Sequence, residues 1–117
     1  MKTVYIVDDS TRIRKRLAEL LSDMENVRVI GQADNAEAAV DDIFRLRPDT
    51  VILDIQLPGR SGLTVLTEVK EKFPGITVIV ITNYDYPQYR RQSMDAGADF
   101  FFNKTREFER LLQVLKT

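Results

Sequence analysis

Side chains able to carry out chemistry follow four separate apolar runs of this sequence, and each stands at or just beyond the end of its run. They are three carboxylates, a hydroxyl and an ammonium group, at Asp8, Asp9, Asp54, Thr82 and Lys104. Runs rich in β-branched and apolar residues are typical of strands buried in a sheet. Because an ionised side chain is costly in an apolar layer, we expect these residues at the sheet edge where open α/β folds place their ligands.

The chemistry that these five side chains suggest is the capture of a phosphoryl group. Three carboxylates close together repel one another, and a hard divalent cation such as Mg²⁺ is the usual means of holding them ionised. Lys104 would add a fixed positive charge, and Thr82 a hydroxyl donor, around the phosphoryl oxygens. Asp54 is the natural nucleophile, since aspartyl phosphates are a known form of covalent carboxylate chemistry. Each residue alone has an ordinary explanation as a cap, a loop hydroxyl or a surface charge, but together these explanations become improbable.

The elements that must position these residues are predicted by the alternation of two patterns. Short β-rich or fully apolar runs predict five strands, at Lys2–Val7, Val27–Ala33, Thr50–Leu53, Ile76–Ile81 and Asp99–Phe102. Segments with apolar residues at helical spacing follow each run. Their expected N-terminal residues are Ser10 or Thr11, the capping-box stretch Asp34–Glu37, Ser61, Pro87 and Thr105. The helix after Pro87 has the thinnest apolar stripe, chiefly Tyr89, Met94 and Ala96, so we expect it to be the least well anchored.

Five strands alternating with five helices predict an α/β fold, a doubly wound parallel sheet with helices on both faces. A closed eight-stranded barrel would need about twice this length. A dinucleotide-binding fold would require a glycine-rich turn after the first strand, where this chain has Asp8-Asp9-Ser10. In a parallel sheet all strands end at the same edge, so the five polar residues should converge there.

The composition excludes several classes of function. Lys and Arg total 17 against 18 for Asp and Glu, so no basic footprint for nucleic acid is present. The absence of Cys excludes thiol and disulfide chemistry, and the absence of His removes the commonest general base. No stretch approaches the roughly 20 apolar residues that cross a bilayer. We therefore expect one cytoplasmic domain over residues 1–117, with no membrane insertion and no direct nucleic-acid binding.

Taken with the motif Asp54-to-Gly59, these features make the chain similar to the receiver domain of two-component response regulators. The resemblance covers Val4 to Leu115 and includes the acidic pair, Thr82 and Lys104. It implies a five-stranded sheet in the flavodoxin-like order 2-1-3-4-5. It also implies a phosphoacceptor signalling domain, not an enzyme acting on other substrates. Its phosphoryl donor would be a sensor histidine kinase or a histidine phosphotransfer protein, and its output an unidentified downstream protein.

By the same resemblance, individual residues receive roles. Asp54 would accept the phosphoryl group, and Asp9 and Asp54 would bind Mg²⁺ directly, together with the backbone carbonyl of Gln56. Asp8 would act on the ion partly through water. On phosphorylation Thr82 would move toward the phosphate, Phe101 would turn inward behind it, and Lys104 would pair with a phosphate oxygen.

The expected output surface lies around the fourth helix, the fifth strand and the last helix. Tyr84, Tyr86 and Tyr89 stand within six residues there and supply amphipathic rings of the kind enriched at interfaces. The alternative is that one or two of them pack the fourth helix onto the sheet, because Tyr is often partly buried.

The sequence departs from the family pattern at three positions. Lys104 is followed by Thr105, where the family usually has a proline in a cis bond, and a non-prolyl cis bond costs about 3 kcal/mol. Asn83 stands where a small residue is common. Phe101 lacks the hydroxyl of the frequent Tyr, so the balance of its inward and outward positions is expected to differ from that of relatives.

Other functions compete with a phosphorylation-switched domain that works as a whole protein. The strongest alternative is the receiver half of a longer DNA-binding transcription regulator. A small phosphatase of the aspartyl-phosphate type would need a second Asp two residues after the nucleophile, and position 56 is Gln. An interaction module that is not phosphorylated is disfavoured, because every acidic-site residue is retained.

Overall fold

The protein is described by a computed structural model over residues 1–116, in which strands and helices alternate along the chain. The strands are β1 (Lys2–Val7), β2 (Val27–Ala33), β3 (Thr50–Asp54), β4 (Thr77–Thr82) and β5 (Phe100–Asn103). The helices are α1 (Thr11–Ser22), α2 (Ala36–Leu46), α3 (Gly62–Lys72), α4 (Pro87–Asp95) and α5 (Phe108–Lys116). Every strand pairing is parallel, and the sheet order is β2-β1-β3-β4-β5. The predicted fold class and strand order are therefore confirmed.

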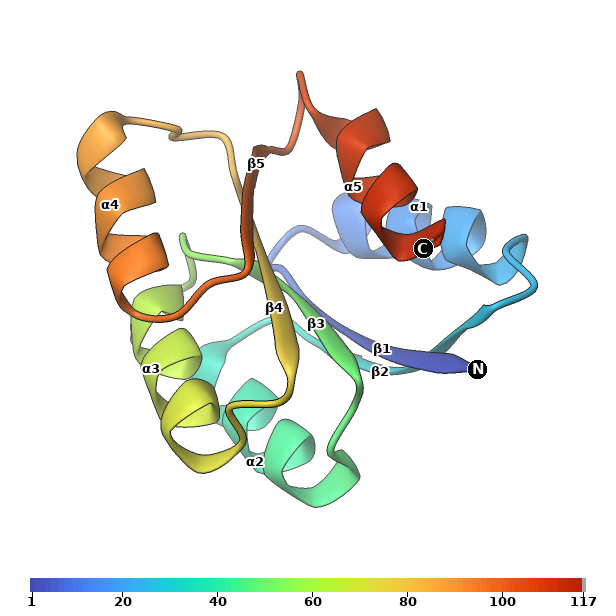
Figure 1. The fold of residues 1–117 in the computed structure, drawn as a ribbon, viewed down its shortest axis with the longest axis horizontal. Helices are drawn as coiled ribbons and strands as arrows, with labels where there is room; N and C mark the ends of the chain where they lie inside the picture. Colours follow the sequence, from blue (N-terminus) through green and yellow to red (C-terminus); the bar gives the residue numbers. More distant parts are fainter. Residues whose placement is uncertain (117) are drawn as a thin grey trace.

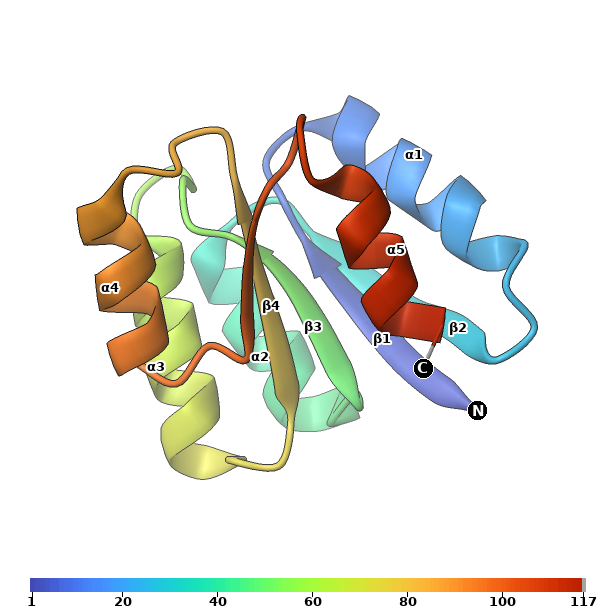
Figure 2. The ribbon, with the colours of Figure 1, turned by 45° about the horizontal axis from the view of Figure 1, so that its top comes forward.

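The sheet separates two helical layers (Figures 1 and 2). Helices α1 and α5 cover one face, and α2, α3 and α4 cover the other. Because successive side chains of a strand point to opposite faces, neighbouring residues of β1 and β4 enter different cores. Tyr5 and Val80 pack with the layer of α2 and α3, whereas Ile6 and Ile79 pack with α1 and α5. The central strands are buried on both faces, which explains their uninterrupted apolar sequence.

The strand register brings the predicted site together. Val7 pairs with Leu53, so Asp8 emerges from β1 beside Asp54 at the end of β3. On the other side of β3, Asp54 itself pairs with Ile81, one residue before Thr82. These neighbours lie far apart in the sequence, and only the parallel pairing makes them adjacent.

Side-chain caps fix where three of the helices begin. The Ser10 hydroxyl accepts the Ile13 amide and the Ser61 hydroxyl accepts the Leu63 amide, as the sequence predicts. The capping prediction for α2 is wrong by one residue, because Asn35 and not Asp34 is the N-cap. The prediction that Thr105 caps the last helix is also wrong. Residues 104–106 form a turn, Glu107 lies in a bend, and α5 begins only at Phe108.

Helix α4 is attached to the sheet by little buried surface, as expected. Its one buried residue is Ser93, whose hydroxyl has no partner among the described residues. Met94, predicted to belong to the apolar stripe, is 43% exposed. Tyr89 and Ala96 do pack against the core from partly buried positions. The weak attachment follows from a sequence in which polar residues occupy most of the helix.

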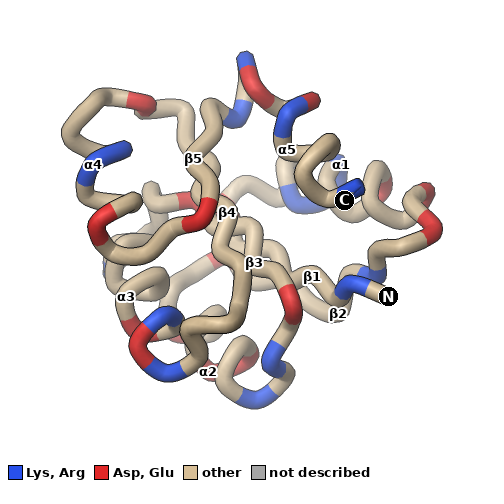
Figure 3. The backbone as a smooth tube through the Cα atoms, viewed as in Figure 1, with Lys and Arg blue, Asp and Glu red and all other residues tan. Residues whose placement is uncertain are grey.

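Acidic and basic residues are interspersed over the elements and do not gather on one side of the molecule (Figure 3). This mixture agrees with the near-equal counts of the two charges. Within residues 1–116, none of the helices combines the length and apolar character that spanning a membrane requires.

Candidate functional site

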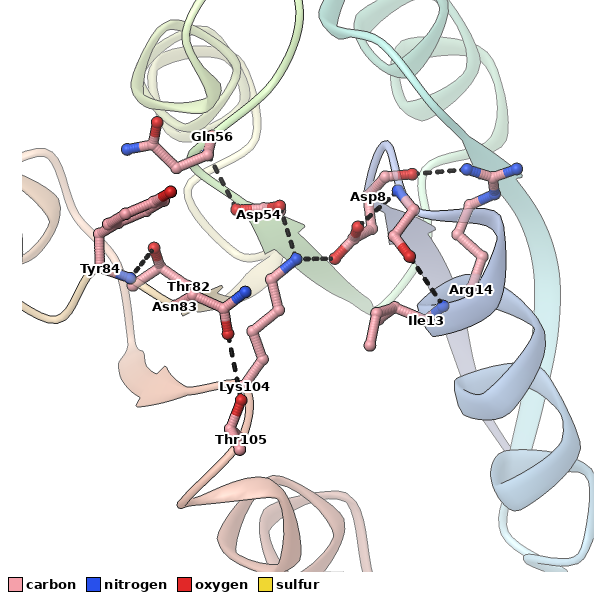
Figure 4. A network of polar contacts seen from close by, with 11 residues as sticks. Asp8, Ile13, Arg14, Asp54, Gln56, Thr82, Asn83, Tyr84, Lys104 and Thr105 are labelled. Carbon is pink, nitrogen blue, oxygen red and sulfur yellow. Dashed lines mark hydrogen bonds and ion pairs between the residues drawn. The ribbon is translucent and has the colours of Figure 1, made fainter.

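A single lysine joins two carboxylates at the carboxyl edge of the sheet. The Nζ atom of Lys104 donates to Oδ2 of Asp8 and to Oδ2 of Asp54, both at 2.8 Å (Figure 4). Lys104 follows β5, Asp8 follows β1 and Asp54 ends β3, so three strands contribute to one cluster. The Lys104 side chain is only 7% exposed, and both carboxylates are buried. The ion pairs are therefore shielded from water. In this less polar surrounding, the attraction between opposite charges is stronger than in water.

The backbone around Asp54 is shaped for close packing. The Gln56 amide donates to Oδ1 of Asp54 at 2.9 Å, which fixes the carboxylate plane. The first residue of α3, Gly62, donates its amide to the Ile55 carbonyl. A Cβ atom at Gly62 would lie 2.3 Å from the Asp54 carbonyl oxygen and 2.6 Å from the Ile55 Cα. Glycine is thus required for α3 to approach the strand that carries Asp54.

The acidic pair after β1 divides its two carboxylates between the interior and the surface. Asp8 is buried and accepts the Ser10 amide at 2.8 Å, whereas Asp9 is exposed. The Asp8 carbonyl accepts Nη1 of Arg14 at 2.7 Å. The sequence analysis did not identify this contact. No spacing rule indicates it, because it depends on how α1 crosses the end of β1.

Burial and hydrogen bonding shift the pKa values of Asp54 and Lys104. Burial raises the pKa of Asp54 to about 6, although hydrogen bonds from Lys104 and the Gln56 amide work in the opposite direction. Burial acts to lower the pKa of Lys104, but the hydrogen bonds to Asp54 and Asp8 outweigh it and leave that pKa raised. Lys104 is therefore held as a cation at neutral pH.

The carboxylates fit a divalent cation. Asp8, Asp9 and Asp54 each offer one oxygen, and these oxygens lie within 4.8 Å of one another. A set made only of oxygen ligands with two or three negative charges is the kind that Mg²⁺ takes in proteins. The three carboxylates expected to bind the ion therefore lie close together, and the part of the Gln56 carbonyl stays a prediction.

Thr82 is buried at the end of β4, and its hydroxyl is engaged with its own loop. Oγ1 accepts the Tyr84 amide at 2.9 Å, and the Thr82 carbonyl accepts the Lys104 amide at 2.9 Å. The second bond extends the pairing of β4 with β5 into the site. Thr82 and Lys104 are therefore joined through the backbone, and among the described residues no hydrogen bond links the Thr82 hydroxyl to Asp54.

An open cavity of about 280 Å³ lies beside the cluster. Its lining residues are Asp9, Asp54, Gln56, Asn83, Tyr84 and Lys104. These residues come from the ends of β1, β3, β4 and β5, and none comes from the loop after β2. The cavity is polar, which suits a small anionic group better than an apolar ligand.

Two of the departures from the family pattern contact each other. Oγ1 of Thr105 donates to Oδ1 of Asn83 at 3.2 Å (Figure 4). The Lys104–Thr105 peptide is trans, since the described residues contain no cis peptide bond. Next to this contact, Arg106 forms an ion pair with Asp85. The loop after β4 is therefore tied to the turn after β5 at two points.

Phe101 occupies the inward position in this structure. Its side chain is buried in the core layer of α2 and α3, on the side from which α4 packs. The guanidinium of Arg90 lies 4.8 Å from the centre of its ring, and Nη2 of Arg90 approaches the Phe101 carbonyl at 3.4 Å. The sequence reasoning did not identify Arg90, because the contact depends on the placement of the weakly anchored α4.

Of the three tyrosines expected at the output surface, Tyr84 lines the cavity beside the acidic cluster, whereas Tyr86 and Tyr89 do not. Tyr84 and Tyr86 are 50% and 54% exposed, whereas Tyr89 is partly buried against the core. Their ring centres are spaced by 6.5 Å and 5.8 Å along the row. The alternative interpretation, in which a tyrosine packs α4 onto the sheet, therefore applies to Tyr89.

Relatives with the same sequence features are known. A model of the response regulator receiver domain family matches residues 4–116. The response regulator GacA of Pseudomonas aeruginosa is 31% identical over 99% of this chain and 54% of its own length. An uncharacterized transcriptional regulatory protein, YvfU, of Bacillus subtilis is 35% identical over 99% of this chain and 58% of its own length. The chain thus spans about half the length of these curated relatives.

The fold is also found among solved structures. A CheY-like response regulator receiver domain protein from Methanospirillum hungatei superposes with a TM-score of 0.90. It is 28% identical, and the match covers 99% of this chain and 91% of that one. The sheet order and the acidic edge define a doubly wound domain of flavodoxin-like topology. More narrowly, the chain belongs to the response regulator receiver domain family, the signal-transducing input domains of two-component systems.

Proposed function

We propose that Asp54 is the phosphoacceptor of this receiver domain and that phosphorylation switches a protein-interaction surface. The observation that carries the proposal is the position of Lys104, whose ammonium group bridges Asp54 and Asp8 beside a polar cavity. The cavity reaches Asp54 from the surface, and its Oδ2 atom can attack a phosphoryl donor once Lys104 shifts its contact to the phosphoryl group. Lys104 supplies a fixed cation next to the position that the phosphoryl oxygens would occupy.

The proposed step is a transfer from a phosphohistidine. An Asp54 oxygen forms a bond to phosphorus while the P–N bond of the donor breaks, and its electron pair remains on the imidazole nitrogen. The other ring nitrogen of the donor carries the proton, so histidine leaves as a neutral group. Asp54 reacts as a carboxylate, which its pKa of about 6 permits at neutral pH.

The residues that would hold Mg²⁺ are Asp8, Asp9 and Asp54, with the backbone carbonyl of Gln56 as a further ligand. When bound, the ion would supply positive charge that offsets the repulsion between these carboxylates and the phosphoryl oxygens. Lys104 can then exchange its contact with Asp54 for one with a phosphoryl oxygen. In this arrangement Asp8 keeps the lysine in place through the second ion pair.

Thr82 and Phe101 are proposed to transmit the change. The Thr82 hydroxyl would leave the Tyr84 amide and move toward the phosphoryl group, and the loop before α4 would move with it. Because α4 is held by little buried surface, a small energetic bias suffices to shift its position. Phe101 is already buried under this helix and in contact with Arg90, so its expected inward turn is not needed, and it would instead follow the same shift.

The proposed output surface comprises α4, β5 and α5, with Tyr84, Tyr86 and Tyr89 at one end. Its partners are proposed to be a histidine kinase or phosphotransfer protein on the input side and a downstream protein on the output side. Amide chemical shifts from Thr82 to Leu111 should change when Mg²⁺ and a phosphate mimic bind. Changes confined to the neighbours of Asp8, Asp9 and Asp54 would reject this surface and leave the acceptor role intact. A cytoplasmic location remains a prediction.

A second candidate is the receiver half of a DNA-binding transcription regulator. Two relatives favour it, because the match covers only part of their length: 54% of GacA and 58% of the transcriptional regulatory protein YvfU. In that case the same surface would act on an output domain in the same polypeptide. The length of the natural reading frame distinguishes the two candidates.

The acceptor role is tested with purified protein, Mg²⁺ and phosphoramidate, followed by intact mass spectrometry. We expect the addition of one phosphoryl group to the wild type and none to Asp54→Asn. Chelation of Mg²⁺ should abolish the reaction. Equal labelling of Asp54→Asn, or labelling that is insensitive to chelation, would show that the site has been assigned wrongly.

A further inference from the structure

The side chain of Asn83 offers a hydrogen-bond donor that the mechanism above does not use. It lines the same cavity as Asp54 and Lys104. Its Oδ1 atom accepts the Thr105 hydroxyl at 3.2 Å, and its Nδ2 atom has no partner among the described residues. In Figure 4 the amide nitrogen points away from Thr105, toward the side of the cavity that Lys104 lines. A neutral N–H donor therefore faces the place where an anionic group would bind.

Thr105 holds the Asn83 side chain at the edge of the cavity. A primary amide has a donor end and an acceptor end of similar shape, and only its partners distinguish them. In this structure Oδ1 is the atom that faces the Thr105 hydroxyl, at 3.2 Å, so the N–H₂ group is directed inward. The adjoining ion pair between Arg106 and Asp85 also keeps the two loops together.

The other donors near the cavity are already occupied or are directed elsewhere. Lys104 uses two of its three N–H groups on Asp8 and Asp54. The side-chain amide of Gln56 also borders the cavity, but it extends away from Asp54 in Figure 4 and has no hydrogen-bond partner within residues 1–116. A phosphoryl group on Asp54 carries several acceptor oxygens with more than one lone pair each, so Lys104, Thr82 and a bound cation leave room for a further donor.

We infer that the Asn83 side chain donates a hydrogen bond to a phosphoryl oxygen at Asp54, with Thr105 as the positioning residue that holds it beside the cavity. This inference rests on the proposed acceptor role of Asp54. It gives a joint function to two departures from the family pattern, Asn83 and Thr105. Asn83 contributes the donor, and Thr105 acts only through Asn83.

The test compares rates of Mg²⁺-dependent phosphorylation by phosphoramidate, measured by intact mass spectrometry at several donor concentrations. Asn83→Ala should lower the rate by about three- to tenfold, the effect of one hydrogen bond on the rim of a site. Asn83→Asp should lower it further, because a carboxylate repels the incoming oxygens. Gln88→Ala removes an exposed amide from α4 outside the cavity and should have no effect.

The role of Thr105 is tested by a double-mutant cycle. Thr105→Val should give a smaller loss than Asn83→Ala, and the double variant should be no slower than Asn83→Ala alone. A contribution of Thr105 to loop structure alone would instead produce additive losses. The affinity for beryllofluoride, which binds without a covalent step, should fall in the same order.

Three results would overturn the inference. If Asn83→Ala reacts at the wild-type rate, the amide makes no contact with the phosphoryl group. If Asn83→Ala reacts faster than the wild type, the Asn83 side chain obstructs the approach of phosphoramidate instead of binding its phosphoryl group. In both cases a phosphorylated wild type and an unreactive Asp54→Asn variant would leave the acceptor role of Asp54 standing. A wild type that is not phosphorylated at Asp54 would reject both proposals.

Discussion

Replacement of Lys104 by Met tests the energetics of the acidic cluster directly. Lys104 contacts Asp8 and Asp54 at 2.8 Å each, and all three side chains are shielded from water. With an effective dielectric constant of about 20, each contact is worth about 6 kcal/mol before desolvation is counted. Desolvation consumes much of this gain, but the loss of one partner leaves charges that are buried and uncompensated. We therefore expect the free energy of unfolding to fall by about 3–5 kcal/mol.

The assay is urea denaturation at pH 8 in the presence of EDTA, because Asp54 is ionised there and no metal replaces the missing cation. Lys15→Met removes an exposed lysine from α1 and should change the stability by less than about 0.5 kcal/mol. Adding Asp54→Asn to Lys104→Met should recover part of the loss, since it removes one unpaired charge. If Lys104→Met is as stable as Lys15→Met, the cluster does not depend on the lysine and the electrostatic reasoning is wrong.

Three further predictions follow from local geometry. Gly62→Ala should destabilise the protein by about 1–3 kcal/mol or more in urea denaturation, because its Cβ would collide with backbone, whereas Gly75→Ala, with open space around it, should be neutral. Tyr84→Ala should speed the loss of the phosphoryl group, measured by mass spectrometry over time, since Tyr84 lines the cavity and shields it from water; an unchanged decay rate would exclude shielding. Hydrogen bonds from the Thr3 amide and hydroxyl lower the pKa of Asp49 below its ordinary value of 3.8. This stabilisation is present above that value and is lost as the pH falls through the lowered pKa. The stability advantage of the wild type over Thr3→Val, less than about 1 kcal/mol, should therefore shrink below pH 4, and a constant difference would contradict the assignment.

The sequence was sufficient to predict the sheet and the residues gathered at its edge. Apolar runs of β-branched residues are unambiguous in this chain, and parallel topology alone makes Asp8 and Asp54 neighbours. The start of α5 was less predictable, because Thr105 has the chemistry of a cap. In the structure Asn103 accepts the Thr105 and Arg106 amides instead, and the helix begins later.

Contacts that depend on how two elements cross could not be predicted. Arg14 has the same residue type as its exposed neighbours, and only the position of α1 brings it to the Asp8 carbonyl. The Thr105 contact with Asn83 similarly joins loops that are separated by more than twenty residues. Nothing in local periodicity encodes such pairs, because they arise from tertiary packing.

The central claim is that Asp54, among three neighbouring carboxylates, receives the phosphoryl group. Borohydride reduction of the phosphorylated protein converts an aspartyl phosphate to homoserine, and peptide mass spectrometry then locates the changed residue. The account predicts homoserine at position 54 and unchanged aspartates at positions 8 and 9, in a reaction that requires Mg²⁺. Homoserine at position 8 or 9, with Asp54 unmodified, would contradict it.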